Sequence, residues 1–235
     1  MEFNKLFVPS LKELFVQELE NMILSGKLEI GTQLPPEREL AESMQVSRAV
    51  VNAGINEMAA KGFLEIRPRI GTFVSDYRRK GTAETLLSIM KYNGGMLRKP
   101  EIRSILEIRI VLDQLAMQLT IPKITDEEIA LLQGYVDALA AAASTDAAAN
   151  AAFDFHHELG IISGNTLLPL IFYSFKQPII NLWQRFCRMY GVAALHRNTS
   201  ELLGYIRRKD ITGAISWVEQ SVGESINGER QIYSE

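Results

Sequence analysis

Residues 34–62 decide the fold, and they read LPPERELAESMQVSRAVVNAGINEMAAKG. Two short segments meet there at a tight turn, and each carries apolar residues at helical spacing on one side. These residues are Leu40, Ala41 and Met44 in the first segment, and Val51, Ile55 and Met58 in the second. Ser47 precedes the second segment and suits an N-cap, because its hydroxyl can accept a hydrogen bond from a free backbone amide.

The opposite side of the second segment is mainly polar. It carries Arg48, Ala49, Asn52 and Asn56. A short helix whose exposed first turn offers Arg and Asn is suited to reading base edges in the major groove of DNA. The stretch therefore predicts a helix-turn-helix.

The composition is that of an ordinary globular protein. The chain has 235 residues, 47% of them hydrophobic and 23% charged, so we expect one or two domains. Its net charge is −3, which argues against indiscriminate binding of polyanions, and residues 1–80 hold eleven Lys and Arg against eleven Asp and Glu. Any contact with DNA must then come from a local patch. The candidates are Arg38, Arg48, Arg67 and Arg69.

Cysteine usage and hydropathy indicate the compartment. Cys187 is the single cysteine, so an intramolecular disulfide and a zinc site of several thiolates are excluded. The N-terminal MEFNKLFVPS lacks the long apolar run of a secretory signal. No stretch approaches the roughly 20 apolar residues that span a bilayer. We expect a cytoplasmic protein with no membrane partner.

The order of elements before residue 76 predicts a winged helix-turn-helix. A helix of about four turns follows Ser10, which suits an N-cap. The helix pair then extends to about Lys61, and residues 63–67 and 72–74 predict a small hairpin, the wing. We place this domain at residues 1–76 and a polar linker at 77–82.

Residues 83–235 predict an all-α antiparallel helical bundle, so the fold class is mainly α. We expect helices at about 83–92, 100–120, 125–143, one ending near 163, a run over 167–194 that Pro178 splits, and helices at 198–208 and 211–230. Thr125 and Asp210 suit the N-caps of two of them. In the helix at 100–120 the residues predicted to face inward are Ile105, Ile108, Leu112, Leu115, Ala116 and Leu119.

The sequence resembles a known family in both parts. Residues 31–74, GTQLPPERELAESMQVSRAVVNAGINEMAAKGFLEIRPRIGTFV, resemble the DNA-binding domain of the GntR family of bacterial transcription regulators. ILEIRIVLD at 105–113 and FHHELGIISGN at 155–165 resemble the all-helical effector domain of its FadR-type branch. The resemblance implies a regulator of transcription, not an enzyme.

The resemblance also implies DNA contacts, residue by residue. They fall on Arg38, Ser47, Arg48, Ala49, Asn52, Arg67 and Arg69. Arg48 begins the recognition helix and can bind guanine through two hydrogen bonds. Asn52 stands where the family has arginine, and asparagine prefers adenine. Gly54 stands where the family has alanine, which predicts close packing against a neighbouring helix.

Some of these residues have a second interpretation. Arg38 lies among glutamates and is also explained by a surface ion pair. The family prefers a glycine and then an arginine at the wing tip, where this chain has Arg69 and Ile70. A solvated hairpin tip explains Arg67 and Arg69 as well as phosphate contact does.

Many effector domains of this branch hold a metal ion through one Asp and three His. The corresponding positions here are Ala152, His156, Thr199 and Ser221, so one ligand of four remains. We expect no metal held in the family's manner and no other cofactor. Asp154, His157 and His196 are an alternative ligand set, although surface or helix-end polar residues explain them better.

The FadR-type branch also has members without a metal, and one of them binds long-chain acyl-CoA inside its helical bundle. Arg109 matches an inward-facing arginine near the effector pocket and can pair with a carboxylate, but a buried ion pair with Asp113 explains it equally well. The candidate effector-binding residues are Arg109, His156, Tyr173, Trp183, Arg185 and Tyr190. The aromatic residues are also explained as plain core.

The resulting hypothesis is a ligand-responsive regulator, most simply a repressor. A homodimer would place two recognition helices in successive major grooves of a near-palindromic, double-stranded DNA operator. A small-molecule effector, a carboxylate metabolite or acyl-CoA, would release it. The alternative is a winged-helix adaptor or architectural protein without an effector. An enzyme is disfavoured, because the sequence carries no P-loop, G-x-S-x-G or HExxH motif.

Overall fold

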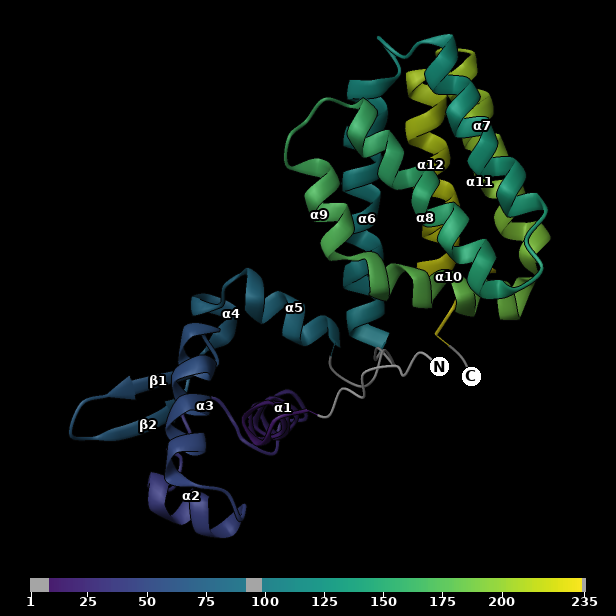
Figure 1. Ribbon diagram of the computed structural model, residues 1–235. Coiled ribbons are helices and arrows are strands. Elements are labelled where there is room, and N and C mark those ends of the chain that lie inside the picture. The colour runs from purple at the N-terminus through teal and green to yellow at the C-terminus, as the bar shows by residue number, and fades with distance from the viewer. Residues whose placement is uncertain (1–8, 92–98, 234–235) are drawn as a thin grey trace, which may run out of the picture. The chain divides into compact units, whose positions relative to one another are not determined.

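The computed structural model describes residues 9–91 and 99–233, apart from the side chains of residues 90, 91 and 101. The chain divides into two compact units, Met1–Gly94 and Gly95–Glu235 (Figure 1). Helices dominate both units, and a two-stranded antiparallel sheet lies in the first. The predicted fold class, mainly α with an N-terminal winged helix-turn-helix and a helical second domain, is confirmed.

In the first unit, three helices precede a β-hairpin. They are α1 (Leu11–Leu24), α2 (Glu37–Ser43) and α3 (Arg48–Ala60), followed by β1 (Leu64–Arg67) and β2 (Gly71–Val74). Ser10 and Glu13 form a capping box at the start of α1. Residues 31–34 run along β2, where the Leu34 N–H donates to the Thr72 carbonyl at 2.8 Å. This extra backbone pairing holds the wing to the rest of the unit.

The core of the first unit lies mainly between α1 and α3. Its buried side chains include Phe15, Leu19, Val51, Ile55, Met58 and Phe63. Gly54 allows the two helices to come close, because a Cβ added there would fall on the ring of Phe15. The close packing predicted at Gly54 is confirmed.

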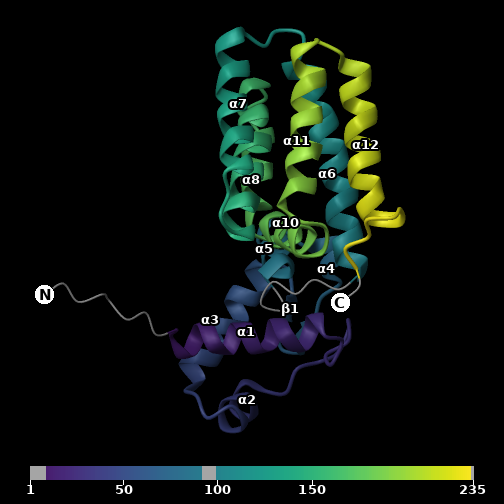
Figure 2. The ribbon, with the colours of Figure 1, turned by 90° about the vertical axis from the view of Figure 1, so that its right-hand side faces the viewer.

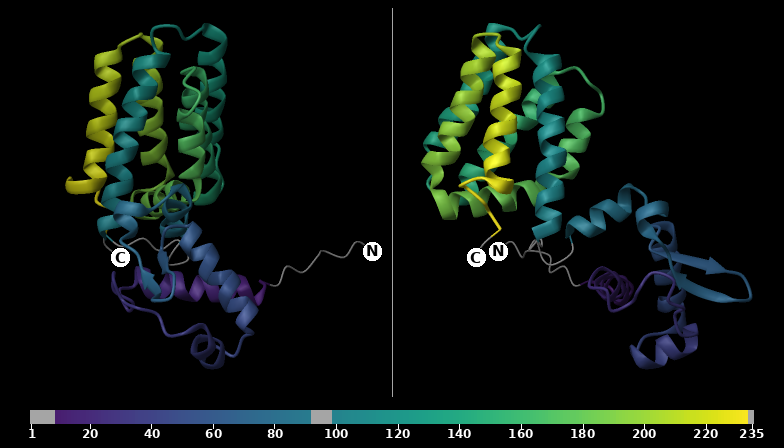
Figure 3. Two further views of the ribbon diagram at one scale, coloured as in Figure 1. Left: turned by 90° about the vertical axis from the view of Figure 1, so that its left-hand side faces the viewer. Right: turned by 180° about the vertical axis from the view of Figure 1, so that it is seen from behind.

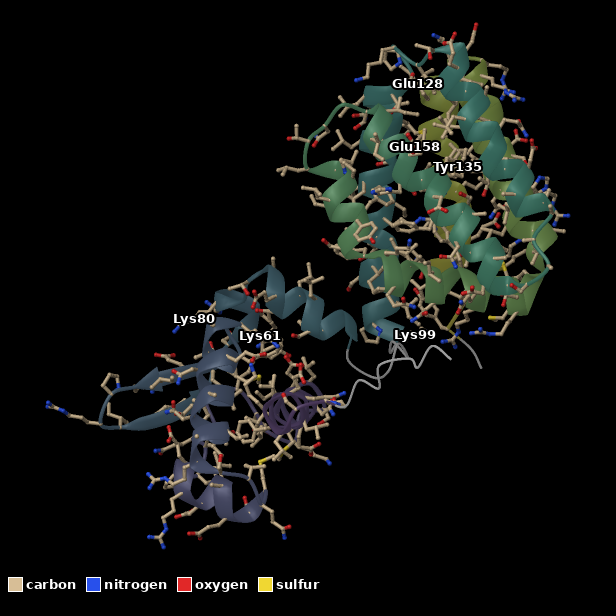
Figure 4. All side chains as sticks on the ribbon, in the orientation of Figure 1. Lys61, Lys80, Lys99, Glu128, Tyr135 and Glu158 are labelled. Carbon is tan, nitrogen blue, oxygen red and sulfur yellow. The ribbon has the colours of Figure 1, made fainter. Side chains whose placement is uncertain are left out.

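Residues 77–91 differ from the prediction, because they belong to the first unit and not to a linker and a second domain. They form α4 (Tyr77–Lys80) and α5 (Ala83–Lys91). The Thr85 hydroxyl donates to the Lys61 carbonyl, and the Ser88 hydroxyl donates to Glu20 Oε1 at 2.8 Å. Lys61, labelled in Figure 4, also pairs with Glu20 at 3.0 Å. The predicted boundary was wrong because this docking depends on partners far away in the sequence.

The second unit is a bundle of helices, as predicted. Its elements are α6 (Lys99–Thr120), α7 (Asp126–Ala140), α8 (Thr145–Ile162), α9 (Leu168–Ser174), α10 (Lys176–Tyr190), α11 (Val192–Arg207) and α12 (Ile211–Asn227). Five of them, α6, α7, α8, α11 and α12, lie side by side along the bundle, and α10 crosses one end (Figures 2 and 3). Thr125 and Asp210 cap α7 and α12 with their side chains, as predicted.

Helix boundaries in the second half differ from the prediction in two places. The break predicted at Pro178 falls at Phe175, and Pro178 lies in the first turn of α10. Proline is tolerated there because its missing N–H has no partner within a helix anyway. α11 begins at Val192, directly after Gly191 with φ 82°, and so starts earlier than the predicted residue 198.

The core of the second unit gathers around α8. Its buried side chains include Met117, Ile121, Leu132, Phe155, Leu159, Phe172, Leu203 and Ile206. Within the described ranges, no helix has both the length and the apolarity that crossing a membrane requires.

α6 carries apolar residues on two faces. Ile105 and Ala116 are buried, with 6% and 0% of their surface exposed, as predicted. Ile108 and Leu119 were predicted to face inward but are 42% and 36% exposed, and Val111 is 63% exposed. The prediction was wrong for Ile108 and Leu119 because helical spacing alone does not tell which of two apolar faces the bundle covers.

Candidate nucleic-acid interface and ligand cavity

The recognition helix α3 presents a polar face to solvent. The Ser47 hydroxyl caps it by accepting a hydrogen bond from the Val50 N–H at 3.2 Å. Arg48, Ala49 and Asn52 are exposed, while the apolar side of the same helix is buried in the core. The helix therefore offers its N-terminal turn, with Arg48 first, to an outside partner.

Asn52 is bound to other side chains of the first unit. Its Nδ2 donates to Glu37 Oε1 at 3.1 Å, and its Oδ1 accepts from Asn56 Nδ2 at 3.1 Å. Asn56 Nδ2 also lies 2.8 Å from the Asn52 carbonyl. To read adenine, as its residue type predicts, Asn52 would therefore have to give up its hydrogen bond to Glu37 or share it.

Arg38 forms the surface ion pair that was one of its two interpretations. Its Nε lies 3.0 Å from Glu42 Oε1 on the next turn of α2, with side chains 75% and 66% exposed. Exposed pairs of this kind contribute about 0–1 kcal/mol. The ion pair therefore leaves contact between Arg38 and DNA energetically accessible.

The wing presents Arg67 and Arg69 differently. The Arg67 guanidinium lies 4.4 Å from the centroid of the Phe73 ring, and its Nε is 3.3 Å from Glu65 Oε1. Arg69 sits at the tip with φ 66°, beside Ile70, which is 65% exposed. Arg67 is thus engaged on the hairpin, and Arg69 is exposed at its end.

In the second unit, three of the predicted effector-binding residues line one cavity. They are Arg109, His156 and Trp183. The polar residues that complete the lining are Asp113, Asn198, Thr199, Ser221 and Ser225, and Trp217 lies among them. The cavity volume is about 40 Å³. This is room for roughly three water molecules or a group of a few atoms.

Asp113 anchors a buried polar cluster at this cavity. Its Oδ2 accepts from Arg109 Nε at 3.2 Å, and its Oδ1 accepts from His156 Nδ1 at 3.0 Å. Arg109 Nη2 lies 3.4 Å from His156 Nε2, which closes a triangle of three side chains. Trp183 covers it, with 5.3 Å between its ring and that of His156 and 4.5 Å from its ring to Arg109 Cζ. The buried ion pair of Arg109 with Asp113 is therefore present, and Arg109 lines the cavity as well.

The cluster changes the acidity of Asp113 and Arg109. Burial alone would raise the pKa of Asp113, but its interactions with His156 and Arg109 outweigh burial and hold that pKa below its usual range. Burial lowers the pKa of Arg109, and Asp113 opposes this by favouring the charged guanidinium. The buried charges of Arg109 and Asp113 thus compensate each other.

The other three predicted effector-binding residues lie outside the cavity lining. Tyr173 is 59% exposed on α9. Arg185 Nη2 donates to the Tyr233 carbonyl at 3.2 Å, and the Tyr190 hydroxyl donates to the Gln231 carbonyl at 2.7 Å. Arg185 and Tyr190 thus hold the segment after α12. From α10, only Trp183 and its apolar neighbours line the cavity.

The residues around the cavity do not fit a metal ion. His156, Thr199 and Ser221 do line one cavity, so three of the four aligned ligand positions converge. However, a metal on His156 Nε2 would sit about 2.0–2.1 Å from it, in the space that the Arg109 guanidinium faces at 3.4 Å. The Thr199 hydroxyl donates to the Leu195 carbonyl at 3.0 Å. Arg109 supplies the positive charge here.

The alternative ligand set is dispersed. His157 stacks on Phe153 with 5.5 Å between ring centroids, and His196 Nε2 lies 3.2 Å from the Ser200 hydroxyl. In the part of the chain that the structure describes, no three His, Cys, Asp or Glu side chains are grouped to hold a metal. Asp154, His157 and His196 therefore do not meet.

Sequence reasoning missed Asn198, Trp217 and Ser225 as cavity residues. All three come from α11 and α12, far from Arg109 in the sequence. The Trp217 indole N–H donates to the Asn198 carbonyl at 2.9 Å, which ties the two helices together. Only the packing of the helices reveals these residues, because no local motif marks them.

Comparison with known proteins identifies the two units. Residues 11–74 match the model of bacterial regulatory proteins of the gntR family, and residues 104–222 match the FCD domain. The chain belongs to the GntR family. Its second unit carries the FCD domain, which is consistent with the FadR-type branch.

Relatives of this GntR-family chain are named as transcription regulators. The HTH-type transcriptional regulator LutR of Bacillus subtilis is 29% identical over 151 residues, 63% of this chain and 65% of LutR. The HTH-type transcriptional repressor NanR of Klebsiella aerogenes is 29% identical over 167 residues, 67% of this chain and 60% of NanR. The chain thus spans less than two thirds of the length of these relatives.

A solved structure shares the fold. The structure comes from a study of Lar, a protein that controls the expression of the Listeria monocytogenes agr system and mediates virulence. The TM-score is 0.63 at 14% identity, over 97% of this chain and 100% of the other. At this identity the likeness concerns the fold alone.

Proposed function

We propose that this GntR-family regulator binds a near-palindromic operator as a homodimer and that a small-molecule effector releases it. The observation that carries the proposal is the exposed first turn of α3, with Arg48 behind the Ser47 cap. An arginine there can make two hydrogen bonds to guanine, a contact that discriminates by about 1–3 kcal/mol. NanR is named a repressor, which supports repression as the output.

The test of operator binding is selection from a library of random duplexes by the purified protein, followed by sequencing. The expected product is a pair of inverted half-sites about one helical turn apart. An adaptor or architectural protein would retain duplexes without a shared sequence. That outcome would overturn operator recognition and leave the winged domain as a general contact module.

The second copy in the proposed dimer would cover the outer face of α6. Ile108, Val111 and Leu119 lie there, exposed to the extents given above, and Leu115 between them is partly buried. An uncovered apolar stripe along a helix is costly in water and is typical of surfaces that meet a partner. A twofold axis through this face would bring two identical stripes together.

The effector that suits the cavity best is a small carboxylic acid. Arg109 uses Nε on Asp113, and its guanidinium carries five N–H donors, so it retains donors for a bound carboxylate. The cavity volume of about 40 Å³ favours a compact acid over the long acyl chain of an acyl-CoA. We therefore propose a compact acid over acyl-CoA, bound without a metal.

Tryptophan fluorescence tests this proposal, because both tryptophans of the chain, Trp183 and Trp217, line the cavity. We expect compact mono- and dicarboxylates, and not acyl-CoA, to change the emission and raise the melting temperature. Arg109→Gln should abolish the response, whereas Arg185→Gln, outside the cavity, should keep it. A response to acyl-CoA alone would overturn the proposed ligand class.

A further inference from the structure

Glu37 places a carboxylate on the face of the first unit that carries the recognition helix. It is the first residue of α2, yet its Oε1 accepts from Asn52 Nδ2 on α3 at 3.1 Å. Asn56 Nδ2 in turn donates to Asn52 Oδ1 at 3.1 Å. The chain Asn56–Asn52–Glu37 thus fixes the direction of the Glu37 carboxylate. Its second oxygen, Oε2, makes no hydrogen bond within the described part of the chain.

No cationic side chain balances the charge of Glu37, and only the N-terminus of the short helix α2 favours it. Among the described residues, no Lys or Arg nitrogen lies within ion-pair distance of it, and the adjacent Arg38 pairs with Glu42 instead. Other glutamates of this unit do have cationic partners. Glu57 pairs with Lys12 and Lys61, and Glu65 pairs with Arg67 and Lys80. Glu37 is bound only by a neutral amide.

A bare carboxylate beside the recognition helix has a definite effect on DNA binding. DNA carries one negative charge per about 1.7 Å of helix axis, so the carboxylate weakens binding to every sequence. That cost is offset only where a base edge offers it a hydrogen-bond donor. In the major groove, guanine and thymine present acceptors, and adenine presents the N7 acceptor beside its amino group. Cytosine presents its amino group as a donor, and this is the group from which glutamate characteristically accepts.

We propose that Glu37 is a specificity-determining residue that selects cytosine in each half-site through Oε2. It does so partly by rejection, because an acceptor at that position would face the carboxylate without a proton between them. Asn52 and Asn56 act as positioning residues for the carboxylate. The inference rests on the proposed binding of an operator and adds a residue that the sequence analysis did not include among the DNA contacts.

The experiment compares wild-type protein, Glu37→Gln and Glu39→Gln in the random-duplex selection, with affinities for the selected operator and for unrelated DNA. Glu39 is the matched control, because it is exposed on the same helix and its replacement by Gln removes the same charge. We expect the wild-type protein to discriminate about tenfold or more for cytosine at one position of each half-site. Glu37→Gln should lose this preference and bind unrelated DNA more tightly.

A second variant separates the direction of the carboxylate from its charge. Asn52→Ala keeps the negative charge and removes the hydrogen bond that directs it. It should weaken the cytosine preference without tightening the binding of unrelated DNA. Melting temperatures of all variants verify that each is folded.

The outcomes distinguish this inference from the function on which it rests. If Glu37→Gln and Glu39→Gln tighten binding equally and the selected sequence stays the same, Glu37 acts only through general charge and the inference is wrong. If the wild-type protein selects no sequence at all, the proposed operator binding itself fails.

Discussion

At the scale of single residues, Asp113 is a buried carboxylate that holds the polar cluster of the second unit together. It is 1% exposed and balances Arg109 while orienting His156. Its pKa is lowered in the folded protein, so its contribution to stability is present above its unfolded pKa of about 3.9. That contribution is lost as the pH falls through the still lower folded pKa.

Asp113→Asn should therefore destabilise the second unit by about 3 kcal/mol or more at neutral pH, because Arg109 loses its buried counter-charge. Thermal unfolding between pH 7 and about pH 3 measures the effect. The wild-type protein should lose stability in acid more steeply than the variant, and Asp126→Asn, at an exposed helix start, should follow the wild type. Parallel pH curves for the wild type and Asp113→Asn would contradict the account.

Gly54 gives a second prediction at this scale. Alanine is the better helix former by about 1 kcal/mol, but its Cβ at position 54 would collide with the ring of Phe15. We expect Gly54→Ala to destabilise the first unit by about 1–3 kcal/mol in chemical denaturation. Gly134→Ala on α7, where nothing lies within 4 Å, should instead stabilise its own unit. A neutral or stabilising Gly54→Ala would show that the two helices are not in close contact.

At the residue scale, the helix caps could be predicted from the sequence, because a cap depends only on residues that are close together in the chain. Ser10, Ser47, Thr125 and Asp210 all cap helices as the sequence indicated. The bonding of Asn52 could not be predicted, since its partner Glu37 lies 15 residues away on another helix. Its orientation depends on how α2 meets α3, which no spacing rule supplies.

At the scale of elements, periodicity predicted most helices and the wing, and it was wrong where two patterns compete. α6 is apolar on both sides, so its spacing matched an inner and an outer face equally well. The run over 167–194 has a proline in its middle, but a helix start tolerates proline and the chain breaks earlier, at Phe175. Helical spacing predicts which residues share a face of a helix, but it does not predict which other element covers that face.

The outer face of α6 gives the prediction that belongs to this scale. Val111→Glu places a charge in the stripe that we propose the second copy covers, and Val111 is 63% exposed, so the fold should persist. Light scattering after gel filtration should show a dimer for the wild type and a monomer for the variant. Leu131→Glu, on the exposed side of α7, is the control and should remain dimeric. A dimeric Val111→Glu would place the interface elsewhere.

At the scale of the whole molecule, the segment between the two units is built into the first. α5 donates from Ser88 to Glu20 on α1, and Thr85 reaches the carbonyl of Lys61 at the end of α3. Within the first unit, α5 is therefore tied both to α1 and to the C-terminal end of α3. Sequence patterns predicted a linker here because these contacts join residues far apart in the chain.

Coupling between the effector and the operator must be reciprocal if the proposed function holds. An effector that weakens operator binding by some factor has its own affinity weakened by the same factor when the operator is bound. Titration of the effector by tryptophan fluorescence, with and without saturating operator, measures this factor. Equal effector affinities in both titrations would mean that the effector does not weaken operator binding, which would contradict the proposed release.

The central claim is that Arg48, at the start of α3, reads a base in the operator. Fluorescence anisotropy with the selected operator and with unrelated DNA tests it for the wild type, Arg48→Ala and Arg103→Ala. Arg103 is the control, because it forms an exposed pair with Glu107 on α6. We expect Arg48→Ala to weaken operator binding about 5- to 150-fold, corresponding to about 1–3 kcal/mol, and unrelated DNA much less. Unchanged affinity and selectivity in Arg48→Ala would contradict the account.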